Sequence, residues 1–462
     1  MTAIYSTLTE LLQERKKLTG TGVTFIEAGA KEVVLPYSEL YDSAISALSF
    51  LQSQGLRPKD ELVFQIEDNR TFVIVFWACI LGGIVPVPLA IGRNDDHKQK
   101  LFNIWPLLKN PFLIISSDNL FQMGAFAQQQ GLESLFAVIG KKMINEADLF
   151  SSNGYGEIYK ADENDIAFVQ FSSGSTGAPK GVMLTHKNLL TNVRAISAAA
   201  NYSKEDSMLS WMPLTHDMGL IGFHINPLFS AMDHYLMPPA LFVRRPSLWL
   251  DKATGHKATI LCAPNFGYEY LMRHCNVVSG QYDWDLRSVR LLYNGAEPIS
   301  ESICRNFLHQ LSKYGLKSNA MCPVYGLAEA SLAVSISGLD NEVESLALSR
   351  NQLQTGARIR LIATGEEHSA TFVNVGEPIN DCLLRIADED NKEMSEEIIG
   401  YIQIKGDNVA AGYYNNASAT QQTITEDGWL KTGDLGFLRN GCLYITGRAK
   451  DILFSNGENY YA

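Results

Sequence analysis

The stretch SSGSTGAPKG, Ser172 to Gly181, carries more information than any other part of this chain. It follows Ile166–Phe171, a short apolar run whose length predicts a buried strand. Its glycines let the backbone approach a bulky anion closely, its hydroxyl and N–H groups can surround phosphate oxygens, and Lys180 adds a positive charge. The order of residues is neither the Walker A motif nor the Rossmann fingerprint. The pattern predicts a phosphate-binding loop; on composition alone, a flexible Ser/Gly surface loop is the alternative.

On both sides of this loop, helical and strand-like segments alternate, which predicts an α/β architecture. Helices are recognised by apolar residues at helical spacing, by capping residues and by glycine just past the end. The clearest segments are helices over Tyr37–Gln54, over Asn188–Ala200 with Thr185 as N-cap, and from Ser300 to Gly315, and strands over Thr259–Ala263 and Val289–Tyr293.

The character of the sequence changes after about Gly338. Asn341–Ser369 is polar and predicts irregular structure. Short β-type segments with turn residues between them follow, such as Tyr401–Lys405 and Cys442–Thr446. This part of the chain therefore predicts a smaller, β-rich subdomain.

Composition narrows the class of protein. A chain of 462 residues is too long for one compact core, so two or more packed units are expected. Apolar residues at 46% and charged residues at 19% fit a soluble globular protein, and a net charge of -12 without a basic run argues against nucleic acid as a partner. Seven cysteines without a CxxC pair, and no signal peptide in Met1–Lys17, indicate reduced thiols in the cytoplasm.

One segment, Phe72–Gly92, is uncharged and long enough to span a membrane. However, Gly82, Gly83, Pro86 and Pro88 interrupt it. We therefore expect a buried helix from about residue 70 to 81, then a turn and a buried strand, and no transmembrane span.

Three further motifs occur in a fixed order after the loop at 172–181. They are Tyr325–Glu329 (YGLAE), Gly428–Asp434 (GWLKTGD) and Gly447–Asp451 (GRAKD). With the Ser/Gly loop, they resemble the phosphate-binding loop, the Tyr-Gly-x-Thr-Glu motif, the ribose-binding motif and the hinge of the adenylate-forming superfamily. The resemblance covers nearly the whole chain, and four ordered motifs are specific. It implies the large N-terminal domain of that fold, with stacked α/β subdomains and a smaller β-rich one.

Finer features resemble the fatty acyl-AMP ligases within that superfamily. These are Trp211–Gly222 (WMPLTHDMGLIG), Ala263–Tyr268 (APNFGY) and Ala328, where many relatives have Thr. From Glu329 to Gly376 the chain also looks longer than in acyl-CoA synthetases. The excess, about Ser345 to Phe372, resembles the insertion thought to hinder thiolation by coenzyme A.

The resemblance implies boundaries as well. We expect an AMP-binding domain over residues 1–447, with the insertion at about 345–372 and the β-rich subdomain at about 373–447. Residues 448–462 would be the hinge, containing Lys450, and the start of a C-terminal lid. The lid and its lysine are absent from this chain, so we expect an N-terminal portion that binds nucleotide but is impaired in full adenylation.

The resemblance further implies roles for individual residues. In adenylation, a carboxylate oxygen attacks the α-phosphorus of ATP and pyrophosphate leaves, so the enzyme must offset negative charge and align the reactants. The groups implied in holding the β- and γ-phosphates are Ser172, Ser173, Gly174, Ser175, Thr176, Gly177 and Lys180. The rest of the nucleotide site would comprise Asn294, Gly295, Ala296, Glu297, Tyr325, Gly326, Leu327, Ala328, Asp434 and Arg448.

Catalysis and acyl binding are assigned in the same way. Glu329 and Thr176 would bind Mg²⁺, and together with Lys180 and His216 they form the expected catalytic set. Taken alone, Glu329 could be a solvated acid at a helix start, and Asp434 a turn residue. The expected acyl-binding residues, most of which would also fit ordinary core packing, are His216, Asp217, Met218, Ile221, Met237, Phe266 and Tyr268.

The function implied is activation of a medium or long fatty acid with ATP to acyl-AMP. The intact enzyme would pass the acyl group to the phosphopantetheine thiol of an acyl carrier protein. An acyl-CoA synthetase is the alternative, and a non-catalytic acyl- or nucleotide-binding module is a third possibility, against which the complete phosphate loop and both carboxylates argue.

Overall fold

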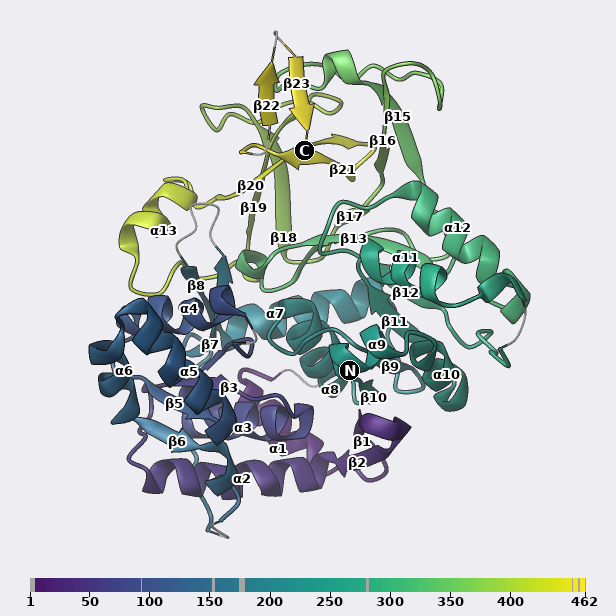
Figure 1. Cartoon of the computed structure of the whole chain (residues 1–462). Coiled ribbons are helices and arrows are strands. Elements are labelled where there is room, and N and C mark those ends of the chain that lie inside the picture. Colours follow the sequence, from purple (N-terminus) through teal and green to yellow (C-terminus); the bar gives the residue numbers. More distant parts are fainter. Residues whose placement is uncertain are drawn as a thin grey trace.

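The computed structural model describes residues 5–92, 94–151, 154–173, 179–279, 282–450, 452–455 and 458–461. Within these residues the largest sheet has nine strands in the order β17-β14-β13-β12-β11-β9-β10-β1-β2 (Figure 1). Its middle, from β13 to β1, is parallel, and the strands at both edges are antiparallel. The strands are β1 Gly22–Ile26, β2 Glu32–Pro36, β9 Ser207–Ser210, β10 Asp233–Leu236, β11 Ile260–Ala263, β12 Leu291–Asn294, β13 Met321–Gly326, β14 Ala333–Ile336 and β17 Glu377–Pro378.

A second, parallel sheet has the order β4-β3-β5-β6. Its strands are β3 Glu61–Gln65, β4 Val85–Pro88, β5 Phe112–Ile115 and β6 Met143–Asn145. Beside it, β7 (Ile166–Ser173) and β8 (Pro179–Thr185) form an antiparallel pair. The strand predicted over 166–171 is therefore confirmed, and it leads directly into the Ser/Gly loop.

Helices cover these sheets, and several begin and end where the sequence predicts. Thr185 caps α7 with a reciprocal pair of bonds, its Oγ1 accepting from the N–H of Asn188 at 3.1 Å. Ser300 caps α12. The helices are α1 Leu8–Arg15, α2 Tyr37–Ser53, α3 Asn69–Gly82, α4 Asp95–Ile104, α5 Ser117–Gln130, α6 Glu133–Gly140, α7 His186–Ala199, α8 Asn226–Phe229, α9 Pro239–Arg244, α10 Ser247–His256, α11 Asn265–His274, α12 Glu301–Leu311 and α13 Ala417–Thr423. The short 3-10 turns are η1 Ala28–Ala30, η2 Trp105–Leu107, η3 Glu146–Asp148, η5 Val277–Ser279, η6 Ser312–Tyr314, η7 Ala328–Ala330 and η8 Arg350–Gln352.

The uncharged run Phe72–Gly92 forms a helix and a strand, as predicted. Helix α3 is buried from Phe72 to Gly82 and ends at Gly83 with φ of +62°, and β4 follows. Among the described residues, the structure contains no helix with the length and apolar character that crossing a membrane requires.

The C-terminal part is built mainly from antiparallel strands and stands above the α/β body in Figure 1. Its sheet has the order β18-β19-β20-β21, with β18 Cys382–Ala387, β19 Gly400–Gly406, β20 Leu430–Arg439 and β21 Cys442–Arg448. A separate hairpin pairs β15 (Ser345–Ser349) with β16 (Ser369–Val373), and β22 (Ile452–Ser455) pairs with β23 (Glu458–Tyr461). The prediction of irregular structure over 341–369 is thus wrong for β15, a strand of only five residues that is ordered by pairing with β16, a partner remote in sequence.

A chain of buried side chains crosses the core between α3 and β10. Trp77 Nε1 donates to His224 Nε2 at 2.8 Å, and His224 Nδ1 lies 2.9 Å from His234 Nε2. His234 Nδ1 lies 3.2 Å from Tyr37 Oη, which donates to the carbonyl of Met232 at 2.6 Å. Because the Trp77 N–H donates to His224 Nε2, each imidazole in this chain must be neutral and carry its proton on Nδ1. Burial lowers the pKa of His224 to about 3 and holds the pKa of His234 well below its usual value.

We expect this histidine pair to make the fold acid-sensitive. Well above pH 6.5 both residues are neutral in the folded and in the unfolded chain. Below pH 6.5 the unfolded chain takes up protons that the folded chain does not. The free energy of unfolding therefore falls as the pH falls. Protonation of the two histidines in the unfolded chain should lower the free energy of unfolding by about 2 kcal/mol between pH 6.5 and 5.5. Urea titrations at both pH values should show this loss, and His224→Gln/His234→Gln should reduce it, whereas the exposed control His309→Gln should not. An equal pH dependence in all three proteins would contradict the expectation.

Candidate nucleotide and acyl site

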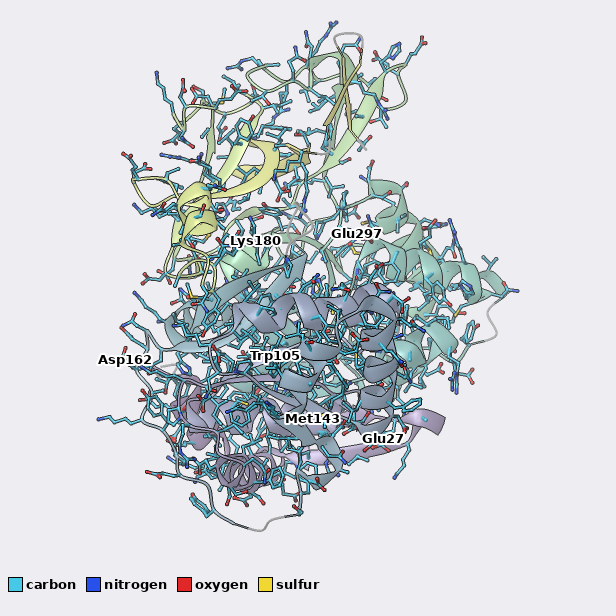
Figure 2. All side chains as sticks on the ribbon, turned by 60° about the vertical axis from the view of Figure 1, so that its left-hand side comes forward. Glu27, Trp105, Met143, Asp162, Lys180 and Glu297 are labelled. Carbon is cyan, nitrogen blue, oxygen red and sulfur yellow. The ribbon has the colours of Figure 1, made fainter. Side chains whose placement is uncertain are left out.

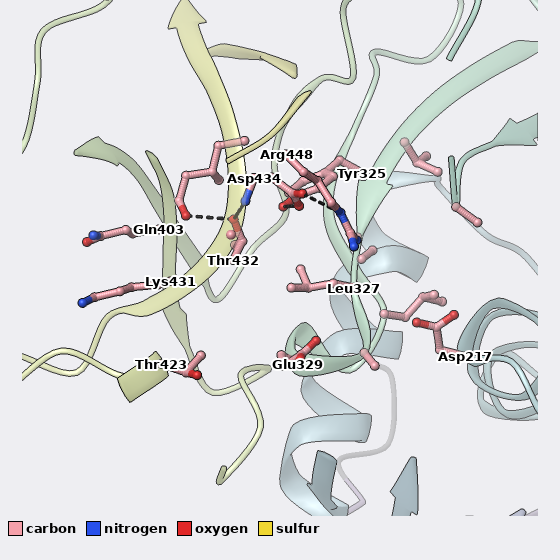
Figure 3. A pocket seen from close by; sticks show the side chains of 18 of the residues that line it. Asp217, Tyr325, Leu327, Glu329, Gln403, Thr423, Lys431, Thr432, Asp434 and Arg448 are labelled. Carbon is pink, nitrogen blue, oxygen red and sulfur yellow. Dashed lines mark hydrogen bonds and ion pairs between the residues drawn. The ribbon is translucent and has the colours of Figure 1, made fainter. Parts of the chain in front are cut away.

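A cavity of about 1070 Å³ lies between the α/β body and the β18–β21 sheet. Its floor comes from the ends of β12 and β13, from η7, and from the π-helix η4 (Met218–Ile225), a rare element that often occurs at functional sites. Its other wall comes from β19, β20 and β21. Figure 3 shows side chains from both walls pointing into this space, and Figure 2 places Lys180 near the level at which the C-terminal part meets the body. Segments more than 200 residues apart in sequence thus share one site.

Asp434 is the centre of a buried polar group on the C-terminal wall (Figure 3). Tyr325 Oη donates to its Oδ2 at 2.6 Å, and Arg448 Nε lies 3.2 Å from its Oδ1. The register of β20 and β21 sets Asp434 directly opposite Arg448, and the hydroxyl of Thr432 accepts from the Asp434 N–H at 3.1 Å. Burial, and then the Asp434 charge, raise the pKa of Tyr325 well above its usual value, so this phenol stays a donor.

Glu329 lies in the turn η7, directly after β13. Tyr413 Oη donates to its Oε1 at 2.8 Å, and Lys180 Nζ lies 4.9 Å from the centroid of the Tyr413 ring. Burial and the Glu329 charge raise the pKa of Tyr413, which keeps the phenol protonated and donating. The turn itself needs a glycine, because a Cβ on Gly326 would lie 1.9 Å from the carbonyl oxygen of Leu332.

The segment that carries Tyr413 is fixed along β8. Gly412 accepts from the N–H of Met183 at 2.9 Å, and the N–H of Tyr414 donates to the Gly181 carbonyl at 2.7 Å. The hydroxyl of Tyr414 donates to Glu61, a fully buried carboxylate on β3 that also accepts two backbone N–H groups. Two adjacent tyrosines therefore hold two carboxylates, one in the cavity and one in the core.

His216 and Asp217 precede η4 and line the cavity. Asp217 Oδ1 lies 2.7 Å from His216 Nδ1 and also accepts from the Met218 N–H at 2.7 Å. Burial disfavours the imidazolium, but the hydrogen bond and the charge of Asp217 outweigh it and raise the pKa of His216. Further in, the cavity becomes an apolar recess lined by Ile196, Met218, Phe223, Val324, Leu332 and Ile336.

Of the residues singled out in the sequence, a large set meets at this cavity: Lys180, His216, Asp217, Met218, Ala296, Tyr325, Gly326, Leu327, Ala328, Glu329, Asp434, Arg448 and Lys450. Gly174, Ser175, Thr176 and Gly177 lie outside the described residues, and of Ser172 and Ser173 only the backbone, paired with β8, is described. Their expected roles stay predictions.

The remaining expected residues lie beside the described lining rather than in it. Asn294 is buried and donates to Asn265 Oδ1 at 2.9 Å, and Glu297 accepts from the N–H of Phe266 at 2.7 Å. Gly295 lies between Asn294 and Ala296 in the sequence. Ile221, Met237 and Tyr268 are core residues at most 1% exposed, whereas Phe266 is 51% exposed. Their expected part in acyl binding stays a prediction.

Sequence reasoning missed several residues that line the cavity, above all Tyr413, and also Gln403, Lys431 and Thr432. A signal for Tyr413 exists in the run Gly412-Tyr413-Tyr414-Asn415-Asn416, where two large aromatic residues occur among turn residues. Lys431 and Thr432 lie within the motif Gly428–Asp434, in which a role was assigned only to Asp434. Gln403 on β19 gives no such signal, because polar residues on an antiparallel strand usually face solvent.

We expect His216 to titrate above the usual pH of a histidine because Asp217 stabilises its charged form. Replacing Asp217 with Asn should lower the pKa of His216, since burial then acts without a compensating charge. Proton NMR titration of the histidine resonances, assigned with His216→Gln, measures both values, and the exposed His309 serves as an internal reference. An unchanged pKa in Asp217→Asn would contradict this account.

The sequence was compared with known protein families and known proteins. The model of the family described as AMP-binding enzyme matches residues 20–414. The chain is 32% identical to a putative acyl-CoA synthetase of Caulobacter vibrioides, and the match covers 99% of this chain and 79% of that protein. It is 31% identical to the medium-chain-fatty-acid–[acyl-carrier-protein] ligase JamA of Moorena producens, again over 99% of this chain and 79% of that protein.

Among solved structures, the chain resembles the fatty acyl-adenylate ligase of L. pneumophila in complex with acyl adenylate and pyrophosphate. The TM-score is 0.85 at 29% identity, and the match covers 97% of this chain and 78% of that chain. The mixed α/β architecture is thus the adenylation-domain fold of the adenylate-forming superfamily. Because the family model also spans most of the sequence, the chain belongs to the AMP-binding enzymes.

Proposed function

We propose that this protein activates a medium- or long-chain fatty acid with ATP, forming acyl-adenylate and pyrophosphate. The acyl group would then pass to the phosphopantetheine thiol of an acyl carrier protein, in the cytoplasm. The observation that supports this best is the single cavity, which joins the polar group around Asp434, the group around Glu329 and Lys180, and an apolar recess. Those three parts suit a nucleoside, a polyphosphate and an alkyl chain, respectively.

The nucleoside part would bind the ribose. The Asp434 carboxylate lines the cavity beside Tyr325 and Arg448, and its oxygens are of the kind that accept hydrogen bonds from ribose hydroxyls. Arg448 offers further N–H donors to the ribose or the phosphate. Ala296, with φ of +73° at the end of β12, turns the backbone beneath the expected position of the adenine.

At the polyphosphate part, a carboxylate oxygen of the fatty acid would attack the α-phosphorus, and the bond from that phosphorus to the pyrophosphate oxygen would break. Both reactants are negatively charged, so positive groups must lie close to them. Lys180 supplies one such charge, and Ser172–Gly177 would hold the β- and γ-phosphates. His216, whose pKa is raised by its contact with Asp217, lines the same cavity and would face the acyl carboxylate.

A divalent cation fits this arrangement. The described residues contain no cluster of three or more His, Cys, Asp or Glu that could bind a metal alone. Mg²⁺ is usually bound by one or two carboxylates together with substrate phosphates, and it retains several waters. Glu329 offers one oxygen that Tyr413 does not occupy, and Thr176 would be the second protein ligand. Bound there, Mg²⁺ would neutralise charge on the phosphates.

An acyl-CoA synthetase remains the alternative, since the reaction up to the adenylate is the same. We propose that the hairpin β15–β16 belongs to the insertion at about 345–372 that would disfavour coenzyme A as acceptor. Supplying the acyl-adenylate with coenzyme A or with an acyl carrier protein separates the two functions. Efficient acyl-CoA formation would favour the alternative.

Ligand binding tests the proposed function directly. Calorimetric titration with a hydrolysis-resistant dodecanoyl-adenylate analogue should give tight binding, and the acetyl analogue should bind at least tenfold more weakly because it leaves the recess unfilled. Asp434→Ala should weaken dodecanoyl-analogue binding by about tenfold to a hundredfold, since hydrogen bonds to a buried charge are lost. The exposed control Asp118→Ala should bind normally. Equal affinity for both analogues would exclude a fatty acid, and no binding of either would exclude the function.

Tyr413 should act as a positioning residue for Glu329. Tyr413→Phe keeps the ring beneath Lys180 but removes the O–H donor, so the Glu329 carboxylate loses its fixed orientation. In ATP–pyrophosphate exchange we expect about tenfold lower kcat and a higher Mg²⁺ concentration for half-maximal rate, with little change in the KM of the fatty acid. Tyr155→Phe, a control at an exposed tyrosine outside the cavity lining, should match the wild type. A loss of rate without any shift in Mg²⁺ dependence would argue against this role.

A further inference from the structure

The inner wall of the cavity contains a buried polar group that the mechanism above does not use. Asn226, the first residue of α8, is fully buried and lines the cavity. Its Oδ1 accepts from the hydroxyl of Ser197 at 2.9 Å. Its Nδ2 has no hydrogen-bond partner within the described part of the chain. A buried amide without a partner is uncommon in folded proteins and points to a missing ligand or water.

Turning the Asn226 amide around does not remove this feature. The Nδ2 group would then donate to the Ser197 hydroxyl, which itself donates to the Val193 carbonyl 2.7 Å away, and Oδ1 would lose its partner. In either orientation, the end of the amide that faces away from Ser197 is the one that remains for a further partner. A hydroxyl group satisfies both cases, because it can donate and accept.

Two tyrosines add a second unused donor to the same cavity. Tyr202 Oη and Tyr293 Oη lie 2.7 Å apart, and both residues line the cavity. Their one shared hydrogen bond uses one of their two hydroxyl protons, and within the described residues no hydrogen bond uses the other. Phe223 connects the two features, since its ring meets Tyr293 edge-on with centroids 6.3 Å apart and it precedes Asn226 by less than one helical turn.

These polar groups stand in otherwise apolar surroundings. Ile196, Phe223 and Ile336 line the same recess, and each is less than 9% exposed. A plain alkyl chain would fill the recess but leave the amide and the phenol desolvated and unpaired. An acyl chain with a hydroxyl at this depth would bury its carbons against the apolar side chains and pair with the polar ones.

Building on the proposed function, we propose that the acyl pocket selects a hydroxylated fatty acid, with Asn226 and the Tyr202–Tyr293 pair recognising the chain hydroxyl. Sites that hydrogen-bond a substrate hydroxyl discriminate strongly against the analogue that lacks it, because their polar groups are then left without partners. An ordered water could pair with the same groups, in which case the pocket would show no preference for a hydroxyl.

The test is calorimetric titration of the full chain with hydrolysis-resistant adenylate analogues of decanoic acid and of each positional isomer of hydroxydecanoic acid. At least one isomer should bind about tenfold or more tightly than the decanoyl analogue. Asn226→Leu should bring the two affinities within about twofold of each other by weakening the hydroxylated analogue, while decanoyl binding is kept or improved. Tyr202→Phe should weaken the preferred isomer as well, and the solvent-facing control Asn306→Leu should change neither.

The outcomes distinguish a failure of this inference from a failure of the proposed function. If the decanoyl analogue binds as tightly as every hydroxylated isomer, the inference is overturned while acyl-adenylate binding stands. If no decanoyl analogue of any kind binds, the proposed function fails and the inference fails with it. Tyr202→Phe keeps the test decisive if Asn226→Leu does not fold, since loss of preference in that variant alone supports recognition of the hydroxyl, and an unchanged preference overturns it.

Discussion

The pairing of the backbone at Ala411–Tyr414 with that at Gly181–Met183 is the contact on which the rest of the site depends. It continues the β7–β8 pair, so the strand that follows the Ser/Gly loop also holds a segment more than 200 residues later. Because backbone bonds fix the register, Tyr413 and Tyr414 point to opposite sides and reach different carboxylates. Together with the bonds from Asn188 Nδ2 to the carbonyls of Asp407 and Val409, this pairing holds Tyr413 beside Glu329 and Lys180.

Three carboxylates in and below the site are each held by a tyrosine hydroxyl. Glu61 and Asp434, which are buried, and Glu329, which is half-buried, each accept a hydrogen bond from a tyrosine, and carboxylates removed from water require such donors. Since burial and the adjacent carboxylate both raise the pKa of these phenols, the donors stay protonated at the pH where the carboxylates are charged. Neutral phenols therefore help to hold the negative groups of the site in place, with Arg448 as a further, charged partner of Asp434.

Local sequence patterns predicted much of the fold because the relevant interactions lie within a few residues of one another. The cap of α7 by Thr185 and Asn188, the end of α12 near Gly315 and the strand entering the Ser/Gly loop are all set by neighbours in sequence. The hairpin β15–β16 escaped prediction because each strand has only five residues and becomes ordered through a partner some twenty residues away. For the candidate site, motifs identified the residues around Glu329, Asp434 and His216, but not the phenol that orients Glu329.

By itself, the sequence determined the chemical groups and their order: a phosphate-type loop after a strand, an acid after Tyr325–Ala328, and an Asp before a hinge-like Gly-Arg. The tertiary structure decided which of these groups meet and what lies deep in the pocket. The opposition of Asp434 and Arg448 comes from strand register, and the unpaired amide of Asn226 comes from the packing of η4 and α8 against α7. The physical reason is the distance along the sequence between the residues that interact. Turns, caps and charge arise from nearby residues, whereas the depth and polarity of a cavity arise from side chains that only the folded chain brings together.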